Sequence, residues 1–185
     1  SYHFIEFEES LTAIGSDIDY FKFYGHSAWY FNLIGRCVLS IAIRGGVIIP
    51  FGNSDEIPIQ KRFFSGGATT IRSFQEKELP PLDEDDNPVG GEGIFLLSTE
   101  LRIPVYGNLG VSAFIDSGQI ISEVRKLKDY RISDLSYAVG FSLWYNTPIG
   151  PIRLVMGINP KRGENELTGT GDPLFAWFIS IGFSY

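Results

Sequence analysis

The side chains that could carry out acid–base, nucleophilic or metal chemistry are few and scattered in this sequence. The two histidines, His3 and His26, lack the spacing of metal ligands. Cys37 is the single cysteine, which excludes an internal disulfide. No serine lies in a Gly-x-Ser-x-Gly motif, and the acidic run at 83–86 lacks the glycine and glutamate spacing of a calcium loop. We therefore expect no enzyme activity, no catalytic residue, no bound metal and no cofactor.

The composition points to an all-β protein of one domain, 1–185. The aromatic share of 15% and the 21 glycines are typical of sheets with tight turns and aromatic girdles. The net charge of -7 argues against nucleic acid as a partner, because phosphates need a basic surface. No segment approaches the roughly 18–20 apolar residues of a membrane-spanning helix. A chain that crosses a membrane without such a helix must do so as a closed barrel, because lipid leaves no partner for an open sheet edge.

Apolar residues alternate with small or polar residues along most of the chain, which is the periodicity of a β-strand. Near the C-terminus, for example, Phe175, Trp177 and Ile179 share one face and Ala176 lies on the other. The same alternation predicts eight strands, the smallest usual even number for a barrel. Their ranges are 1–14, 22–34, 37–51, 93–105, 107–120, 135–149, 150–160 and 173–185. The first is ambiguous, because it carries glutamates on both faces.

The distribution of charge favours a strand face that meets lipid. Arg44, Glu100, Asp116 and Arg153 all fall at mid-strand on the polar face, while aromatic residues crowd the ends of the apolar face. A soluble barrel has an apolar interior and charges outside. We therefore predict an antiparallel transmembrane β-barrel of about eight strands. A soluble sandwich or a lipocalin-like barrel is the alternative, because alternation alone does not say which face points inward.

The connections between the predicted strands differ in length in the way that transmembrane barrels show. Short turns at 34–36 and 146–151 are typical of the periplasmic side, and the long polar segments 52–92, 121–134 and 161–172 of the outer side. A segment as long as 52–92 is rare between strands of a compact domain unless it has a function.

The long loop 52–92 contains the most specific motif of the chain, R-F-F-S-G-G-A-T-T-I-R-S-F at 62–74. It resembles the signature loop of the BamA/TamA family of outer-membrane assembly and translocation barrels, also known as the bacterial surface antigen family. The matching loop residues are Phe64, Gly66, Gly67, Ile71, Arg72 and Phe74. Further matches follow in the family's order at 91–92, 100–104, 113–118 and 147–153, before a closing strand that ends on an aromatic residue.

The resemblance implies that the long loop folds back toward the lumen, where Arg72 meets acidic residues. The alternation supports this independently, because Glu100 and Asp116 lie on the polar face of the two strands that follow the loop. We expect an Arg72–Glu100–Asp116 cluster that anchors the loop, since an unpaired charge away from water is costly. A solvated loop arginine is the alternative. Ser73 departs from the family motif, which has glycine there; this indicates a less strained turn or a divergent branch.

The resemblance also implies a function and a location. Members insert or translocate other proteins at the bacterial outer membrane, which makes client outer-membrane proteins, lipid and lipopolysaccharide the expected partners. The closing strand would be the gating element, with Phe183 and Tyr185 as its own assembly signal. A small structural or adhesive barrel without assembly activity and a narrow pore are the alternative functions.

The extent of the barrel is left open by the sequence. Family members resemble sixteen-stranded barrels preceded by POTRA domains, with five strands after the signature loop. Three predicted strands precede the loop here and five follow it. The chain is therefore half of such a barrel, a complete eight-stranded member, or one copy of a homo-oligomer in which two chains pair.

Overall fold

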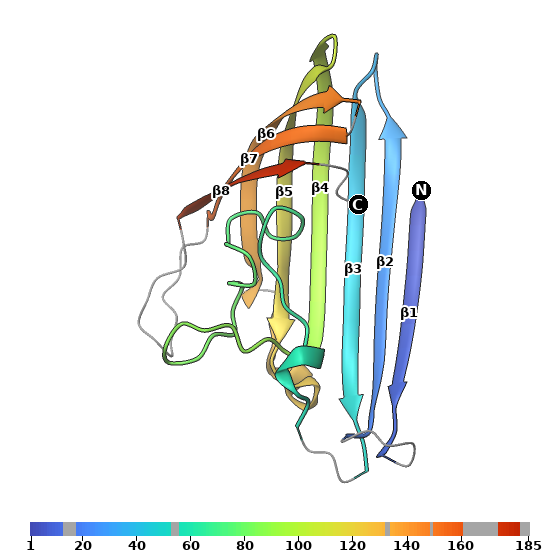
Figure 1. The fold of residues 1–185 in the computed structure, drawn as a ribbon, viewed down its shortest axis with the longest axis vertical. Helices are drawn as coiled ribbons and strands as arrows, with labels where there is room; N and C mark the ends of the chain where they lie inside the picture. Colours follow the sequence, from blue (N-terminus) through green and yellow to red (C-terminus); the bar gives the residue numbers. More distant parts are fainter. Residues whose placement is uncertain (13–17, 53–55, 132–133, 149, 161–173, 182–185) are drawn as a thin grey trace.

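A computed structural model describes residues 1–12, 18–52, 56–131, 134–148, 150–160 and 174–181. These residues form one eight-stranded antiparallel sheet in which every strand pairs with its neighbour in the sequence (Figure 1). The strands are β1 (Tyr2–Ser10), β2 (Tyr20–Asn32), β3 (Val38–Pro50), β4 (Gly93–Tyr106), β5 (Leu109–Ile121), β6 (Ser136–Thr147), β7 (Gly150–Ile158) and β8 (Phe175–Ile181). The predicted all-β antiparallel architecture is confirmed.

The largest boundary difference from the predicted strands lies at the first connection. The alternation extends the first strand to residue 14, but β1 ends at Ser10 and β2 already begins at Tyr20. Apolar residues such as Leu11 belong to the connection rather than to the strand, and periodicity alone cannot distinguish the two cases.

The sheet is curved and open. Figure 1 shows β6, β7 and β8 bending over the side of the sheet on which the green loop segment lies. Within the described residues β1 pairs only with β2 and β8 only with β7, so the sheet does not close on itself. An open, curved sheet is what half of a larger barrel looks like, and it differs from the closed eight-stranded alternative.

The convex face is the apolar face that the alternation predicts. Phe175, Trp177 and Ile179 of β8 are 58%, 57% and 65% exposed, whereas Ala176 between them is 1% exposed. The same pattern runs through β4 to β7, where exposed apolar side chains alternate with buried polar or small ones. A face this rich in exposed apolar groups is suited to lipid rather than to water.

The glutamates of β1 lie on both faces, as expected. Glu8 pairs in register with Lys22 on the concave side, and Glu9 pairs with Phe21 on the convex side.

No helix among the described residues has the length and apolar character needed to span a membrane. The helical segments there are the 3₁₀ turns η2 (Ile59–Lys61) and η3 (Val124–Asp129).

The hydrophobic core lies between the long loop and the concave face of the sheet. Ile71 and Phe74 of the loop are completely buried. They belong to a cluster with side chains from β2 to β7 that includes Leu96, Phe114 and Val155. The loop therefore fills the inside of the curved sheet, in agreement with the predicted return toward the lumen.

Candidate functional site: the inward loop and its anchors

The paired glycines of the loop make its turn sterically possible. Gly66 and Gly67 have φ angles of 111° and 99°, which side-chain-bearing residues rarely adopt. A Cβ at Gly66 would also meet the carbonyl oxygen of Gln75, and one at Gly67 the carboxylate of Glu76. The loop thus folds against itself at this point, and the amide of Gly67 donates to the carbonyl of Phe74 at 2.9 Å. This closure places residues 71–73 at the inner end of the loop.

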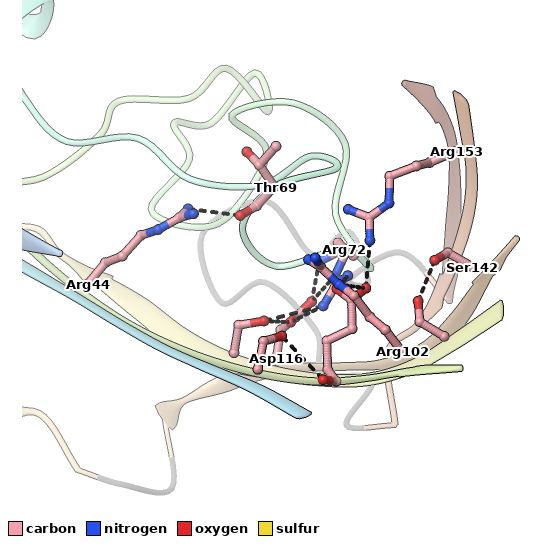
Figure 2. A network of polar contacts seen from close by, with 11 residues as sticks. Arg44, Thr69, Arg72, Arg102, Asp116, Ser142 and Arg153 are labelled. Carbon is pink, nitrogen blue, oxygen red and sulfur yellow. Dashed lines mark hydrogen bonds and ion pairs between the residues drawn. The ribbon is translucent and has the colours of Figure 1, made fainter. Parts of the chain in front are cut away.

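Arg72 binds Asp116 of β5 through two nitrogens on one edge of its guanidinium group. Nε lies 2.8 Å from Oδ2 of Asp116, and Nη2 lies 2.8 Å from Oδ1 (Figure 2). The backbone amide of Arg72 donates to the same carboxylate at 3.2 Å. Asp116 is 0% exposed and Arg72 is 4% exposed. A two-pronged, charge-assisted pair of this kind fixes orientation as well as position.

Glu100 of β4 is shared by three arginines. Arg72 Nη1 lies 2.8 Å from Oε2, Arg153 Nη2 lies 2.6 Å from Oε1, and Arg102 Nε lies 3.1 Å from the same Oε1. β4 and β7 are separated by two strands in the sheet, so the contact from Arg153 depends on the curvature of the sheet. Through Glu100 the loop is linked both to β4 and to the distant strand β7.

Two neighbours complete the surroundings of Arg72. Its guanidinium carbon lies 3.4 Å above the ring centre of Phe114, which is a cation–π contact. Ser98 donates to Asp116 at 2.7 Å. Burial alone would lower the pKa of Arg72, but its hydrogen bonds and charge pairing with Asp116 and Glu100 outweigh burial and raise that pKa. Arg72 therefore stays charged.

The strand β7 leaves room for the loop backbone at Gly157. A Cβ at this position would collide with the carbonyl oxygen of Arg72 and lie 3.0 Å from the amide nitrogen of Ser73. Ser73 itself is completely buried, and its hydroxyl donates to the carbonyl of Tyr137 at 2.8 Å. Its φ is not positive, so this turn does not require the family's glycine. The serine instead adds a hydrogen bond from the loop to β6.

A second, more exposed anchor holds the base of the loop against β1 and β2. Lys61 Nζ lies 2.6 Å from Glu8 Oε1, which also accepts the hydroxyl of Tyr20 at 2.5 Å. Lys22 donates to the backbone carbonyl of Lys61 at 2.9 Å. The hydrogen bond to Glu8 raises the pKa of Lys61. The loop is thus fixed to β1 and β2 at its start and to β4, β5 and β7 at its tip.

The structure brings together the three residues of the expected cluster, Arg72, Glu100 and Asp116. Among the other loop residues, Phe64 is half-buried, with Lys77 Nζ 5.7 Å from its ring centre. Arg102 and Arg153 were not part of the expected cluster, although mid-strand charge on the polar face was the signal that marked Arg153. Phe183 and Tyr185 lie outside the described residues, so their expected role as an assembly signal stays a prediction.

The sheet is antiparallel and open, its convex face is apolar, and its concave face binds a returning loop through buried ion pairs. Together these features define part of a transmembrane β-barrel. Residues 1–183 match the Omp85 superfamily domain. The chain belongs to the Omp85 superfamily, which confirms the predicted kinship with BamA-type barrels and the predicted location in the bacterial outer membrane.

Several named proteins resemble the chain over most of its length. The outer membrane protein assembly factor BamA of Nitratidesulfovibrio vulgaris (strain Hildenborough) is 26% identical over 155 residues, which are 82% of this chain and 19% of that protein. BamA of Neisseria meningitidis serogroup B is 23% identical, over 83% of this chain and 23% of that protein. The human sorting and assembly machinery component 50 homolog is 27% identical, over 72% of this chain and 27% of that protein. The chain thus spans about a fifth to a quarter of these relatives.

The fold is also that of a solved BamA barrel. The crystal structure of BamA from Haemophilus ducreyi lacking POTRA domains 1-3 superposes with a TM-score of 0.68 and 19% identity. The match covers 90% of this chain and 36% of that chain. The described sheet therefore corresponds to part of a larger barrel.

Proposed function

We propose that this chain is part of a barrel that inserts or translocates other proteins at the outer membrane. The observation that carries the proposal is the inward loop, fixed to β4, β5 and β7 by the buried Arg72–Asp116–Glu100 network. Its relatives are named as outer-membrane and sorting assembly components. The proposed activity needs no covalent chemistry, so no catalytic residue is invoked. Client outer-membrane proteins are the proposed partners.

In this proposal the loop keeps the concave surface in one shape while clients pass along the barrel. A loop without anchors would have many conformations, and ordering it would cost conformational entropy each time the barrel worked. Buried ion pairs at its tip and the Lys61–Glu8 pair at its base remove that cost in advance. The tip network is therefore the part of the site on which activity should depend most.

Depletion and complementation of the full-length protein test the proposal. Depletion should lower the amount of several folded barrels in the outer membrane, and the wild-type gene should restore them. Arg72→Ala should restore them poorly even where its own barrel accumulates, whereas Arg36→Ala, an exposed arginine in the turn between β2 and β3, should restore them fully. Normal levels of outer-membrane barrels after depletion would exclude the assembly function.

The same depletion experiment separates the other expected functions. If the protein is a structural or adhesive barrel, its depletion should leave the assembly of other barrels normal and should alter envelope integrity or adhesion. Ion conductance of the purified full-length protein in a planar bilayer would favour the pore. Binding of lipopolysaccharide and formation of a homo-oligomer stay predictions.

A further inference from the structure

A turn rich in basic residues follows β5, outside the region of the Arg72 network. It comprises residues 122–131 and contains the 3₁₀ helix η3. Arg125, Lys126, Lys128 and Arg131 of this turn are all exposed. The segment 123–131 carries these four cations and two carboxylates, whereas the whole chain has a net charge of -7. The turn is therefore a local positive surface on an acidic protein.

Most of this positive charge is not neutralised within the described part of the chain. Lys126 pairs with Glu123 at 2.5 Å. The side chains of Arg125, Lys128 and Arg131 form no hydrogen bond or ion pair with any other residue that the structure describes. Leu127 lies between two of the lysines in sequence and is 52% exposed. Exposed cations around an exposed apolar side chain suit a surface that is anionic outside and apolar beneath.

Hydrogen bonds hold the backbone of the turn in one shape. The amide of Val124 donates to Oε2 of Glu92 at 2.9 Å, and Glu92 is a buried residue directly before β4. The amide of Ser122 donates to the hydroxyl of Tyr130 at 2.8 Å, which closes the turn on itself. The cations are thus carried by an ordered segment, so that binding a partner need not order the backbone first.

The register of the strands places the start of the turn at the border of the apolar convex face. Ile121, the last residue of β5, lies in one row with residues of β4, β3, β2 and β1, which are Gly93, Val47, Phe23 and Phe7. Phe7 and Phe23 are exposed, and their ring centres lie 4.9 Å apart. Aromatic side chains form girdles at the two interfaces of a transmembrane barrel. The turn therefore lies at the level of the lipid headgroups.

The long connections of the sheet lie at this same end. The segments 51–92 and 122–135 join strands here, whereas 33–37 and 107–108 join strands at the opposite end. Figure 1 shows this end at the bottom, with the turn beneath the arrowhead of β5. Long loops lie on the outer side of bacterial transmembrane barrels, and short turns lie on the periplasmic side. The basic turn is therefore on the side of the outer leaflet.

We propose that the turn 122–131 binds phosphate groups of lipids in the outer leaflet. Arg125, Lys128 and Arg131 supply the counter-charges, and Leu127 contacts the acyl chains. Lys and Arg clusters beside a membrane-spanning segment bind anionic headgroups, with each cation contributing about fivefold in affinity. A lipid offers phosphate and an apolar chain together, which matches this surface better than a free phosphate ion does. The site gives the expected lipid partner a place on the protein and does not depend on the proposed assembly function.

Lipid binding to the fluorescently labelled full-length protein in detergent tests the site, with thermophoresis as the measurement. The probes are diphosphoryl lipid A and phosphatidylcholine, which has no net charge. We expect diphosphoryl lipid A to bind at least about tenfold more tightly, and the difference to shrink at high salt, because salt screens exposed charges. Equal affinities for the two lipids would overturn the proposal. Full competition by an equal concentration of inorganic phosphate would also contradict it, since lipid would then not be required.

Variants place the binding on this turn. The double variant Arg125→Gln with Lys128→Gln should weaken binding of diphosphoryl lipid A about tenfold or more. Heat-modifiability should stay that of the wild type, because both side chains are exposed. The single variant Arg125→Gln is compared with Arg36→Gln, which removes an exposed arginine at the opposite end of the sheet and should leave the affinity unchanged. Wild-type affinity in the double variant would show that the lipid binds elsewhere on the protein and would refute the proposal.

Discussion

Asp116 is the residue whose position most constrains the inward loop. It is completely buried, and among the described residues Arg72 is the cation that pairs with it. Removing one member of a buried ion pair leaves the other charged and desolvated, which typically costs about 3–5 kcal/mol. The pair therefore holds the loop in place even where its net contribution to the free energy of folding is small.

Arg72→Ala should lower the free energy of unfolding of the full-length protein by about 3–5 kcal/mol, because Asp116 loses its counter-charge. The free energy of unfolding of Arg72→Lys should lie between those of the wild type and Arg72→Ala, since lysine keeps the charge but loses the two-pronged contact. Urea unfolding in detergent, with protease cleavage of the loop as a second readout, measures both. Arg36→Ala is the matched control. An Arg72→Ala protein with wild-type stability and loop protection would show that Arg72 does not anchor the loop.

Gly157→Ala tests the close approach between β7 and the loop backbone. The added methyl group would meet the carbonyl oxygen of Arg72, so the loop tip or the strand must shift. Overpacking of this kind costs about 1–3 kcal/mol. Gly25→Ala is the control, because a Cβ there has only the carbonyl of Phe4 nearby, at 3.9 Å. Equal unfolding midpoints for the two variants would show that the backbones do not pack this closely.

The residue-level pattern was only partly predictable from the sequence. Alternation assigns Glu100 and Asp116 to the inner face, so their meeting with Arg72 could be expected. The contribution of Arg153 could not, because it depends on how far the sheet curves between β4 and β7, and side-chain periodicity carries no information on curvature. The hydrogen bond of Ser73 to Tyr137 likewise depends on the exact depth of the loop tip.

At the scale of elements, the strands were far easier to predict than the loop. Each strand repeats a two-residue pattern over 7–14 residues, which gives many concordant signals. The loop between β3 and β4 has no period. Its course is fixed by the positive φ of Gly66 and Gly67 and by contacts with residues distant in the sequence. Its two anchors differ in burial, which predicts a difference in strength.

Lys61→Met should cost no more than about 1 kcal/mol, and the loss should shrink at high salt, because exposed ion pairs are weak and screened. The side chains of Lys61 and Glu8 are 47% and 32% exposed, in contrast to the buried pairs of Arg72. Unfolding at low and at high salt, side by side with Arg72→Ala, measures the contrast. A salt-independent loss as large as that of Arg72→Ala would contradict the ranking of the two anchors.

For the whole molecule, the sheet needs two different surroundings at once. Its convex face carries exposed apolar side chains from β1 to β8, whereas the charged side chains of the strands, apart from Glu9 of β1, lie on its concave face. The direction of the apolar face was predictable from the position of the mid-strand charges. That the described sheet stays open was not, because strand number and closure depend on neighbours beyond the local pattern.

The depth at which the convex face lies in the lipid can be tested by introducing an arginine at either of two positions on that face. Ile115 at the middle of β5 and Val105 near the end of β4 are 58% and 61% exposed. Arginine costs about 2–4 kcal/mol at the midplane of the bilayer and about 0–1 near its surface. Folding of the full-length protein into lipid vesicles should therefore suffer more from Ile115→Arg than from Val105→Arg. Equal losses would mean that β5 does not cross the membrane.

The sharing of Glu100 has a consequence for the order of assembly. Its carboxylate receives Arg153 from a strand 53 positions later, so the network reaches its final composition only after β5, β6 and β7 have joined the growing sheet. Until then the loop tip lacks both the steric groove at Gly157 and one of its bridging cations. Seating of the loop should thus follow, and not precede, the pairing of β4 to β7.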